Sequence, residues 1–335
     1  MHCKSFPFKS STVALVIAAA MASAYAQSNV SISGAVRLAV ARSNGGTSPL
    51  YGSGNTARWT MNDNLSSLSF SGREDLGGGT YAGFSLQHFL QADSGADSNF
   101  SPNTWFDGQS IVSLGGRWGE ITMGRNYTPT ILIGFAIDPW GWDGSATQVG
   151  ALELANYFST SGIRTNNTVG YTTPTINGFT GKLAVSAGEQ AKTGTDVGSS
   201  LVYAKGPVYV AGAWDQHKAA VGTTTDRLAT VAAGYDFGLV KPMALFAKSR
   251  VNGVAYSSMV LSATAPVGAG VLKAAVARID DWNTGNGTKD PLTKVSLGYQ
   301  HNLSKRTHLF SGISNAKGSG ATRTTVVDLG IGHTF

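Results

Sequence analysis

The last nine residues of the chain, VDLGIGHTF (residues 327–335), alternate apolar side chains with polar or small ones and end on an aromatic ring. An alternation with a period of two predicts a β-strand with one apolar face and one polar face. Similar alternation recurs along the chain, most clearly at residues 30–40, 179–186, 208–215 and 294–300. The sequence therefore predicts an all-β fold, and we count about sixteen strands.

Two kinds of connection separate the expected strands. Short turn signals rich in Gly, Pro, Asp and Asn recur, for example at residues 115–119, 205–207 and 302–304. The other connections are longer and more polar, and residues 126–162 form the longest segment without alternation. Strands of about ten residues with short turns at one end and long loops at the other are typical of an antiparallel up-and-down transmembrane β-barrel. Such a barrel pairs every backbone group in hydrocarbon because its sheet is closed.

The composition agrees with a barrel and argues against other classes of protein. Only 13% of the 335 residues are charged, whereas roughly 25% is usual in soluble domains. The 7 Trp, 11 Tyr and 14 Phe argue against a disordered chain. No apolar run has the length of about 18 residues that a membrane-spanning helix needs. An exported soluble β-sandwich binding protein has strands of the same pattern and is the alternative fold.

The N-terminal segment has the features of a secretory signal peptide. Two lysines precede an uncharged apolar run at residues 13–22, and Ala24-Tyr25-Ala26 follows it as a cleavage site. We therefore expect residues 1–26 to be removed and residues 27–335 to form the barrel. The one cysteine of the chain lies in the removed part, so the barrel is expected to have no disulfide and no thiolate metal site.

Five stretches carry a resemblance to a known family. They are GREDLGGGTYAG (72–83), VSLGGRWGEITMGRNYTP (112–129), IRTNNTVGY (163–171), VSLGYQHNLSKRT (295–307) and GIGHTF (330–335). On these stretches the chain resembles the general porins of Gram-negative bacteria, specifically the β-proteobacterial trimeric group. The resemblance implies a homotrimer of water-filled barrels in the cell outer membrane. It also implies contact with outer-membrane lipid and lipopolysaccharide and with the barrel-assembly machinery, for which a terminal Phe335 resembles the insertion signal.

The resemblance also implies a third extracellular loop that folds into the lumen as a constriction. Residues 126–162 correspond to this loop, and in the family an acidic loop face opposes a basic wall cluster. The acidic candidates of the loop are Asp138, Asp143 and Glu153. On the wall, Arg164 matches a basic position of the family within the IRTNN motif.

Two wall positions depart from the family pattern, because Ser67 and Gly108 stand where anion-selective relatives carry arginine. We therefore expect a weak to moderate preference for anions, with small anionic and neutral solutes as the permeants. Alternation places further basic candidates on the inner face, and Arg125 at the base of the loop is expected to pair with loop carboxylates. These inner-face candidates are Arg37, Lys182 and Lys294.

A substrate-specific outer-membrane channel is the alternative function, since Trp140, Trp142 and Tyr157 of the loop could form a track for sugar-like solutes. Other chemistry finds no support in the sequence. The histidines lack metal-ligand spacing, and neither a nucleophile elbow nor a phosphate-binding loop is present. We therefore expect no enzyme activity, no cofactor, no metal and no nucleic-acid partner.

Overall fold

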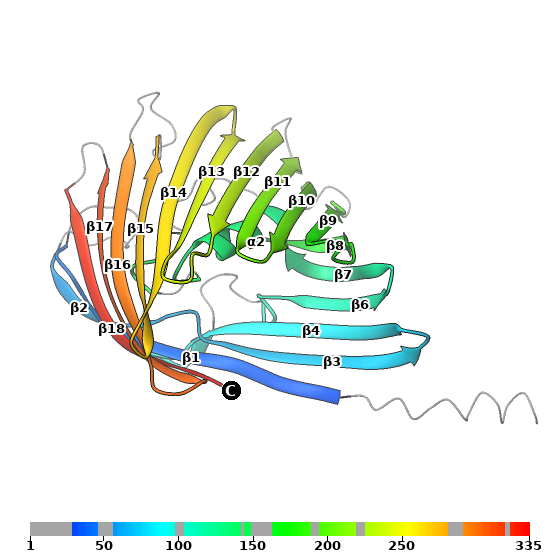
Figure 1. Ribbon diagram of the computed structural model, residues 1–335, viewed down its shortest axis with the longest axis horizontal. Helices are drawn as coiled ribbons and strands as arrows, with labels where there is room; N and C mark the ends of the chain where they lie inside the picture. Colours follow the sequence, from blue (N-terminus) through cyan, green and yellow to red (C-terminus); the bar gives the residue numbers. More distant parts are fainter. Residues whose placement is uncertain are drawn as a thin grey trace, which may run out of the picture.

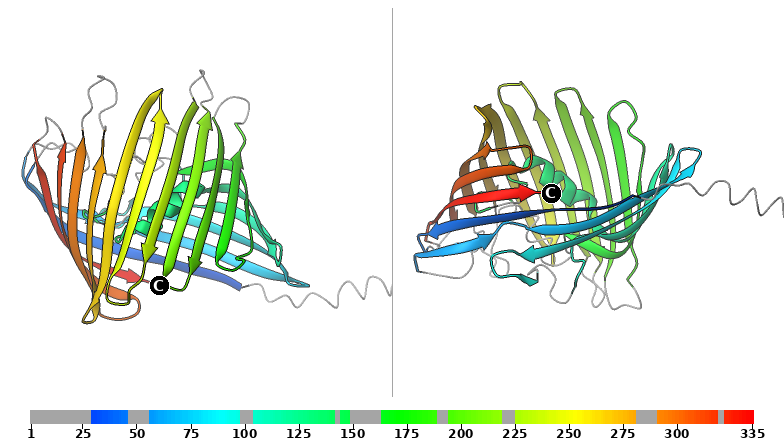
Figure 2. Two further views of the ribbon diagram at one scale, coloured as in Figure 1. Left: turned by 45° about the horizontal axis from the view of Figure 1, so that its top comes forward. Right: turned by 90° about the horizontal axis from the view of Figure 1, so that it is seen from below.

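The computed structural model is a single closed antiparallel β-barrel (Figures 1 and 2). The described residues are 29–45, 56–97, 104–141, 144–148, 163–188, 194–218, 225–280, 291–318 and 322–335. The strands are β1 (Asn29–Ser43), β2 (Arg58–Asp63), β3 (Ser67–Gly77), β4 (Thr80–Gln91), β5 (Ala96–Asp97), β6 (Ser110–Gly116), β7 (Gly119–Tyr127), β8 (Arg164–Thr172), β9 (Phe179–Ser186), β10 (Thr195–Lys205), β11 (Val208–Lys218), β12 (Thr225–Tyr235), β13 (Lys241–Val251), β14 (Val254–Val267), β15 (Gly270–Ile279), β16 (Leu292–Asn302), β17 (Thr307–Gly318) and β18 (Thr324–Thr334).

The described strands form a barrel of 16 strands, which confirms the sequence-based expectation. β2 and β3 are two parts of one barrel strand, since both pair with β1, and β5 is a two-residue extension beside β4. The barrel closes where β1 pairs with β18, from Ala35 opposite Thr334 to Ser43 opposite Val326. Phe335 continues this closure, because its backbone and that of Gly34 exchange two hydrogen bonds of 3.1 Å. A closed sheet has no edges, so the alternative of a two-sheet sandwich is wrong.

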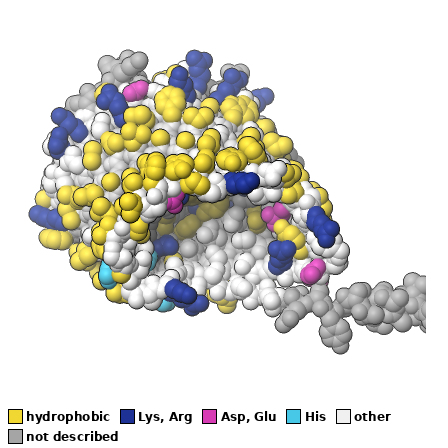
Figure 3. Space-filling view, in the orientation of Figure 1, with side chains coloured by type: hydrophobic (Ala, Val, Ile, Leu, Met, Phe, Trp, Pro, Cys, Tyr) yellow, Lys and Arg dark blue, Asp and Glu magenta, His cyan; other side chains and the backbone are white. Residues whose placement is uncertain are grey.

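Side chains alternate across the barrel wall as the sequence predicts. On β1, Val30 and Ile32 are more than 60% exposed, whereas Ala35 and Ala39 of the inner face are buried. Figure 3 shows a broad band of hydrophobic side chains across the face of the barrel that is in view. Among the described residues no helix is long and apolar enough to cross a membrane. The exposed apolar side chains on the outward faces of the strands have the pattern of a lipid-facing barrel wall.

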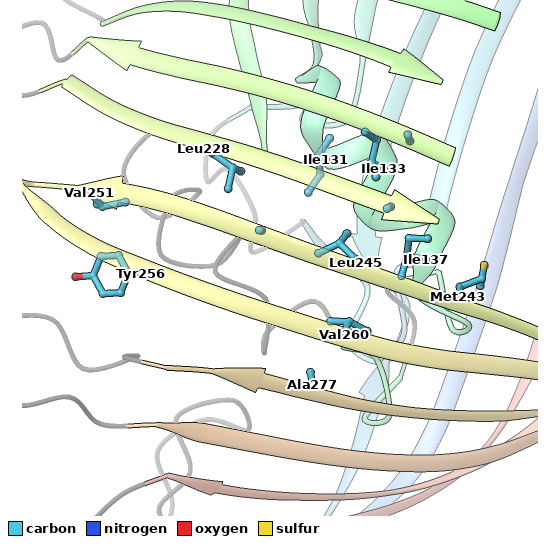
Figure 4. Close-up of a cluster of buried hydrophobic side chains, with 13 residues drawn as sticks. Ile131, Ile133, Ile137, Leu228, Met243, Leu245, Val251, Tyr256, Val260 and Ala277 are labelled. Carbon is cyan, nitrogen blue, oxygen red and sulfur yellow. The ribbon is translucent and has the colours of Figure 1, made fainter. Parts of the chain in front are cut away.

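The one helix of the described residues, α2 (Pro129–Ile137), lies inside the barrel (Figure 1). Thr128 precedes it in an extended conformation, and Pro129 fits its first turn, where a missing N–H costs nothing. The helix packs Ile131, Ile133 and Ile137 against apolar residues of the inner wall (Figure 4). The main buried hydrophobic cluster is thus formed between the third long connection and the inner faces of β11 to β15.

The sequence did not predict α2, because its segment is apolar on all sides and has no helical alternation of polar and apolar residues. The helical periodicity that the sequence shows at residues 151–158 lies outside the described residues. One connection is also shorter than expected, at the end of the barrel where the sequence predicts long loops. β13 and β14 are joined by Asn252 and Gly253 alone, both at positive φ (49° and 83°), which is the geometry of a tight hairpin turn.

Candidate pore constriction

Helix α2 is held on the inner wall by two polar contacts as well as by its isoleucines. The Thr130 backbone N–H donates to the Asp215 carboxylate of β11 at 3.2 Å. At the other end of the helix, the Ser262 hydroxyl of β14 donates to the Ile137 carbonyl at 2.7 Å. Asp215 and Ser262 are both buried. The beginning of the third loop is therefore fixed along β11 to β14, as the expected inward fold of this loop requires.

A second set of contacts fixes residues 144–148 of the loop to the strands that follow along the same wall, β16 to β18. The Asp328 carboxylate of β18 accepts hydrogen bonds from the Ser145 N–H at 2.9 Å and the Ser145 hydroxyl at 2.5 Å. The Gln148 side chain donates to the Ser296 hydroxyl of β16 at 2.8 Å. Because α2 lies on β11 to β14 and this segment on β16 to β18, the third loop covers much of the inner wall on one side.

Lys294 faces inward, as the alternation along its strand predicts, and it binds the third loop. Its side chain is 2% exposed, and its ammonium group donates to the Thr147 carbonyl. The charges of Asp138 and Asp328 act on it. Asp138, at the C-terminal end of α2, is itself buried and accepts hydrogen bonds from the Thr147 hydroxyl and the Trp140 N–H. Asp138 and Lys294 therefore lie within the loop–wall contact.

Arg164 lies at the start of β8, beside the base of the third loop. Its Nη2 donates to the Tyr127 hydroxyl at 3.0 Å. Its guanidinium carbon lies 4.5 Å from the centre of the Tyr127 ring and 4.9 Å from that of Phe89, within the range of a cation–π contact. The Tyr127 ring meets Phe135 of α2 edge-on at 5.7 Å. Arg164 is thus connected to the loop helix through Tyr127.

The IRTNN motif positions Arg164 through a β-bulge. The register between β7 and β8 shifts between Gly124 and Asn126, and Asn167 has a φ of 54°. Asn is one of the residues that adopt this left-handed conformation with least cost. The neighbouring Asn166 side chain accepts a hydrogen bond of 2.7 Å from Arg125 Nη1. Asn167 therefore allows the bulge in the strand that carries Arg164, and Asn166 accepts the hydrogen bond of Arg125.

Arg125 and Arg164 lie close enough for their positive charges to repel each other. Arg125 Nε also donates to the Asp107 carbonyl at 3.0 Å. The Asp107 carboxylate is fully buried and accepts a hydrogen bond of 2.9 Å from the Phe89 N–H. No sequence pattern indicated Asp107, because the connection that carries it has no periodicity.

The two positions that depart from the family pattern lie in the same region. Ser67 is opposite Phe89 in the register of β3 and β4. A Cβ atom at Gly108 would lie 2.6 Å from the Gln87 side chain, so Gln87 fills the space beside this glycine. The Tyr127 hydroxyl donates to Gln87 at 2.9 Å. Neutral polar groups therefore occupy this part of the wall beside Arg164.

The remaining predicted residues lie apart from Arg164. Lys182 is on the inner face of β9, between the outward Leu183 and Gly181, and interacts with the charges of Glu120 and Asp215. Arg37 is on the inner face of β1, where its backbone N–H donates to the Ser66 hydroxyl at 2.9 Å. The other loop candidates, Asp143, Glu153, Trp142 and Tyr157, lie outside the described residues.

Arg37 lines a pocket that no sequence pattern indicated. The pocket has a volume of about 150 Å³ and lies between Trp140 of the loop and the wall. Lys273 of β15 also lines it, and its ammonium group donates to the Gln300 side chain at 3.0 Å. Lys273 follows the outward Leu272, so alternation could have placed it on the inner face. Within the described part of the chain, no group of three His, Cys, Asp or Glu side chains could hold a metal ion.

Comparison with known proteins agrees with this geometry. The profile of the Gram-negative porin family matches residues 11–321. Outer membrane porin protein 32 of Delftia acidovorans is 33% identical over 336 residues, covering 94% of this chain and 91% of that protein. The structure of an anion-selective porin from Comamonas acidovorans superposes with a TM-score of 0.79 at 28% identity, covering 92% of this chain and all of that one. OmpT of Vibrio cholerae in its trimer form has a TM-score of 0.71 at 15% identity, and the match covers 92% of this chain and 99% of that one.

The family profile and the relative from Delftia acidovorans each span most of the chain, and the anion-selective porin structure shares its barrel fold. The protein is therefore a channel of the outer membrane. By sequence and by structure, the chain belongs to the Gram-negative porin family.

Proposed function

We propose that this porin passes ions and small hydrophilic solutes by diffusion with a weak to moderate preference for anions. The observation that carries the proposal is the pair of arginines, Arg125 and Arg164, beside the base of the third loop. On the loop side, the buried Asp138 takes part in the loop–wall contact with Thr147 and Lys294. A cluster of one sign in a narrow pore attracts counter-ions and repels co-ions. The neutral groups at Ser67 and Gly108 limit the strength of this preference.

The test is the zero-current potential of the channel in a salt gradient across a planar bilayer. The wild type is expected to favour anions, and Arg164→Ala is expected to shift the potential toward cations. The shift should be largest at low ionic strength, where screening is weakest. Arg306→Ala, in a short turn outside the constriction, is the matched control and should leave the potential unchanged. A cation-selective wild type, or no shift with Arg164→Ala, would contradict the proposal.

Diffusion is favoured over binding of one substrate class. Trp140 packs against the wall, since its indole nitrogen lies 3.0 Å from the position that a Cβ of Gly298 would occupy. Liposome swelling with solutes of graded size separates the two functions. Rates should fall smoothly with size, whereas rates that differ by chemical identity at equal size would support the substrate-specific channel.

We further propose the assembly and targeting that the resemblance implies: a cleaved segment at residues 1–26, a homotrimer, insertion guided by Phe335, and contact with outer-membrane lipid. Leu329 of β18 is 65% exposed on the outer face beside the barrel closure, in the region where we expect the trimer contact. Cross-linking of the extracted protein should give a trimer. We propose no catalytic activity and no cofactor for this channel.

A further inference from the structure

His88 of β4 lies on the outer side of the barrel wall, behind the arginines of the constriction. Neighbouring residues of a strand point to opposite faces of the sheet, and Phe89 points inward, where its ring contacts Arg164. His88 therefore points outward, yet its side chain is buried. The Trp105 ring covers it, stacked at 4.4 Å with an angle of 10° between the two planes. A histidine is thus enclosed directly behind the part of the wall that carries Arg164.

Both ring nitrogens of His88 face oxygen atoms. Nδ1 contacts the Trp105 carbonyl, which can only accept a hydrogen bond. Nε2 lies 3.4 Å from a carboxylate oxygen of Asp97 on β5. A neutral imidazole has one N–H donor, whereas an imidazolium has two. The surroundings of His88 therefore suit a doubly protonated, positively charged ring.

The buried carboxylate of Asp107 lies between His88 and the constriction. Its Oδ1 is 3.8 Å from Nδ1 of His88 and also accepts the Phe89 N–H. Its Oδ2 is buried and accepts no hydrogen bond from the described residues. On the other side, the charge of Asp107 acts on Arg125, whose Nε donates to the Asp107 carbonyl. One carboxylate therefore faces two basic side chains, His88 behind the wall and Arg125 beside the base of the third loop.

The strands packed beside His88 differ in the charges that they bring near it. On β3, the residue opposite His88 is the uncharged Leu68. At the end of β2, the Asp63 carboxylate accepts the N–H of Ala92, four residues beyond His88. Beyond Asp107, the arginine pair of the constriction contributes positive charge. Histidine is the side-chain type of this group that gains or loses its charge between about pH 5 and about pH 8.

We propose that His88 is a specificity-determining residue that acts through Asp107. When its ring is protonated, it offsets the charge of Asp107, so the positive charge of Arg125 and Arg164 acts on the permeating ions. When its ring is neutral, the Asp107 carboxylate offsets Arg125 instead, and the preference for anions decreases. Salt screens this interaction little, because His88 and Asp107 are both buried. The inference deepens the anion preference proposed above and rests on it.

The test measures the zero-current potential of the wild type and of His88→Gln in one salt gradient, from about pH 5.5 to about pH 8.5. As the pH rises, the wild type should shift toward cations, and its anion-to-cation permeability ratio should fall roughly twofold. His88→Gln should lack this step and should have the lower ratio throughout. His333→Gln removes an exposed histidine at the short-turn end of β18. It is the matched control and should keep the step.

Two further variants separate the charge of His88 from its packing. His88→Lys places beside Asp107 a cation that keeps its charge over this pH range, and should hold the higher ratio throughout. On an Asp107→Asn background, His88→Gln should no longer change the potential, because the carboxylate that connects it to the constriction is absent.

Four results would overturn the proposal: a wild type without a step, a wild type that shifts toward anions as the pH rises, a full step in His88→Gln, or a lower ratio in His88→Lys. A full step in His88→Gln would assign the titration to another histidine, such as His217 or His308. The step is read as a change with pH, so it is measured whichever ion the channel prefers. A cation-selective wild type would reject the proposed anion preference, whereas loss of the step alone would reject only the role of His88.

Discussion

Replacing Asp328 by Ala should release the third loop from the wall. The Asp328 carboxylate is 5% exposed and accepts both hydrogen bonds of Ser145. A hydrogen bond to a charged group contributes about 1.5–3 kcal/mol. The Lys294 ammonium, buried nearby, would also lose one of the two carboxylates whose charges act on it. Taking the lower value for each bond, we expect the attachment of residues 144–148 to weaken by about 3 kcal/mol.

A change of about 3 kcal/mol corresponds to a roughly 100-fold larger population of the detached loop. Detachment moves the segment in and out of the current path, so single-channel recordings in planar bilayers should show increased open-channel noise. Ser145→Ala removes the hydroxyl bond but keeps the N–H bond, and should give a smaller increase. Asp328→Asn keeps the shape and one acceptor oxygen, and should lie between the wild type and Asp328→Ala.

The control for a lost carboxylate is Asp236→Ala, since Asp236 lies in an exposed short turn and accepts one bond of 2.8 Å from Gly238. It should leave the noise at the wild-type level. If Asp328→Ala gives the same noise and mean conductance as this control, the third loop is not held by Asp328. Residues 144–148 would then be held against β16 to β18 by other contacts.

Three further substitutions test other parts of the constriction. Ile133→Ala in α2 should lower the free energy of unfolding by about 2–4 kcal/mol through a cavity against the wall, measured in urea with Leu132→Ala as the exposed control. Asn167→Ala should destabilise the bulge by about 1 kcal/mol and reduce the preference for anions. Asn167→Gly should keep the wild-type stability and the wild-type anion preference, because glycine accepts a positive φ. Lys273→Gln should shift the zero-current potential toward cations by less than Arg164→Ala does; an equal or larger shift would place the main selectivity at the Arg37–Lys273 pocket.

The barrel was predictable from sequence because a lipid-facing wall imposes a period of two on every strand. Val30 and Ile32 show it at one end of the chain, and Leu329 and Ile331 at the other, where the structure pairs β1 with β18. Register was not predictable, since alternation fixes the face of a residue but not its neighbour. The opposition of Arg227 and Arg250 therefore became visible only in the structure.

The constriction was predictable in part, and the limit lies in the third loop. Alternation placed Lys294 on the inner face, but its bond to Thr147 joins residues 147 positions apart in a segment without periodicity. Helix α2 could not be recognised in the sequence because its residues are apolar on all sides, so no polar face marks its period. The IRTNN motif drew attention to Arg164, yet the bulge at Asn167 that orients it requires backbone geometry.

The attachment of the third loop affects whether the pore favours anions or cations. A loop inside a barrel replaces water against the wall, so its polar groups need partners there. Asp138 finds the Thr147 hydroxyl and the charge of Lys294, and the wall in turn contributes Asp328 to hold Ser145. Asp138 and Lys294 carry opposite charges within one contact, and Asp328 lines a pocket together with Arg37 and Lys273, so these charges are largely balanced within the loop–wall contact. Arg125 and Arg164 repel each other across the base of the loop, and the one buried carboxylate beside this pair, Asp107, offsets only part of their charge. We therefore expect the wall arginines, more than Asp138, to set the field beside the described part of the loop and to give a weak preference for anions even with neutral residues at Ser67 and Gly108.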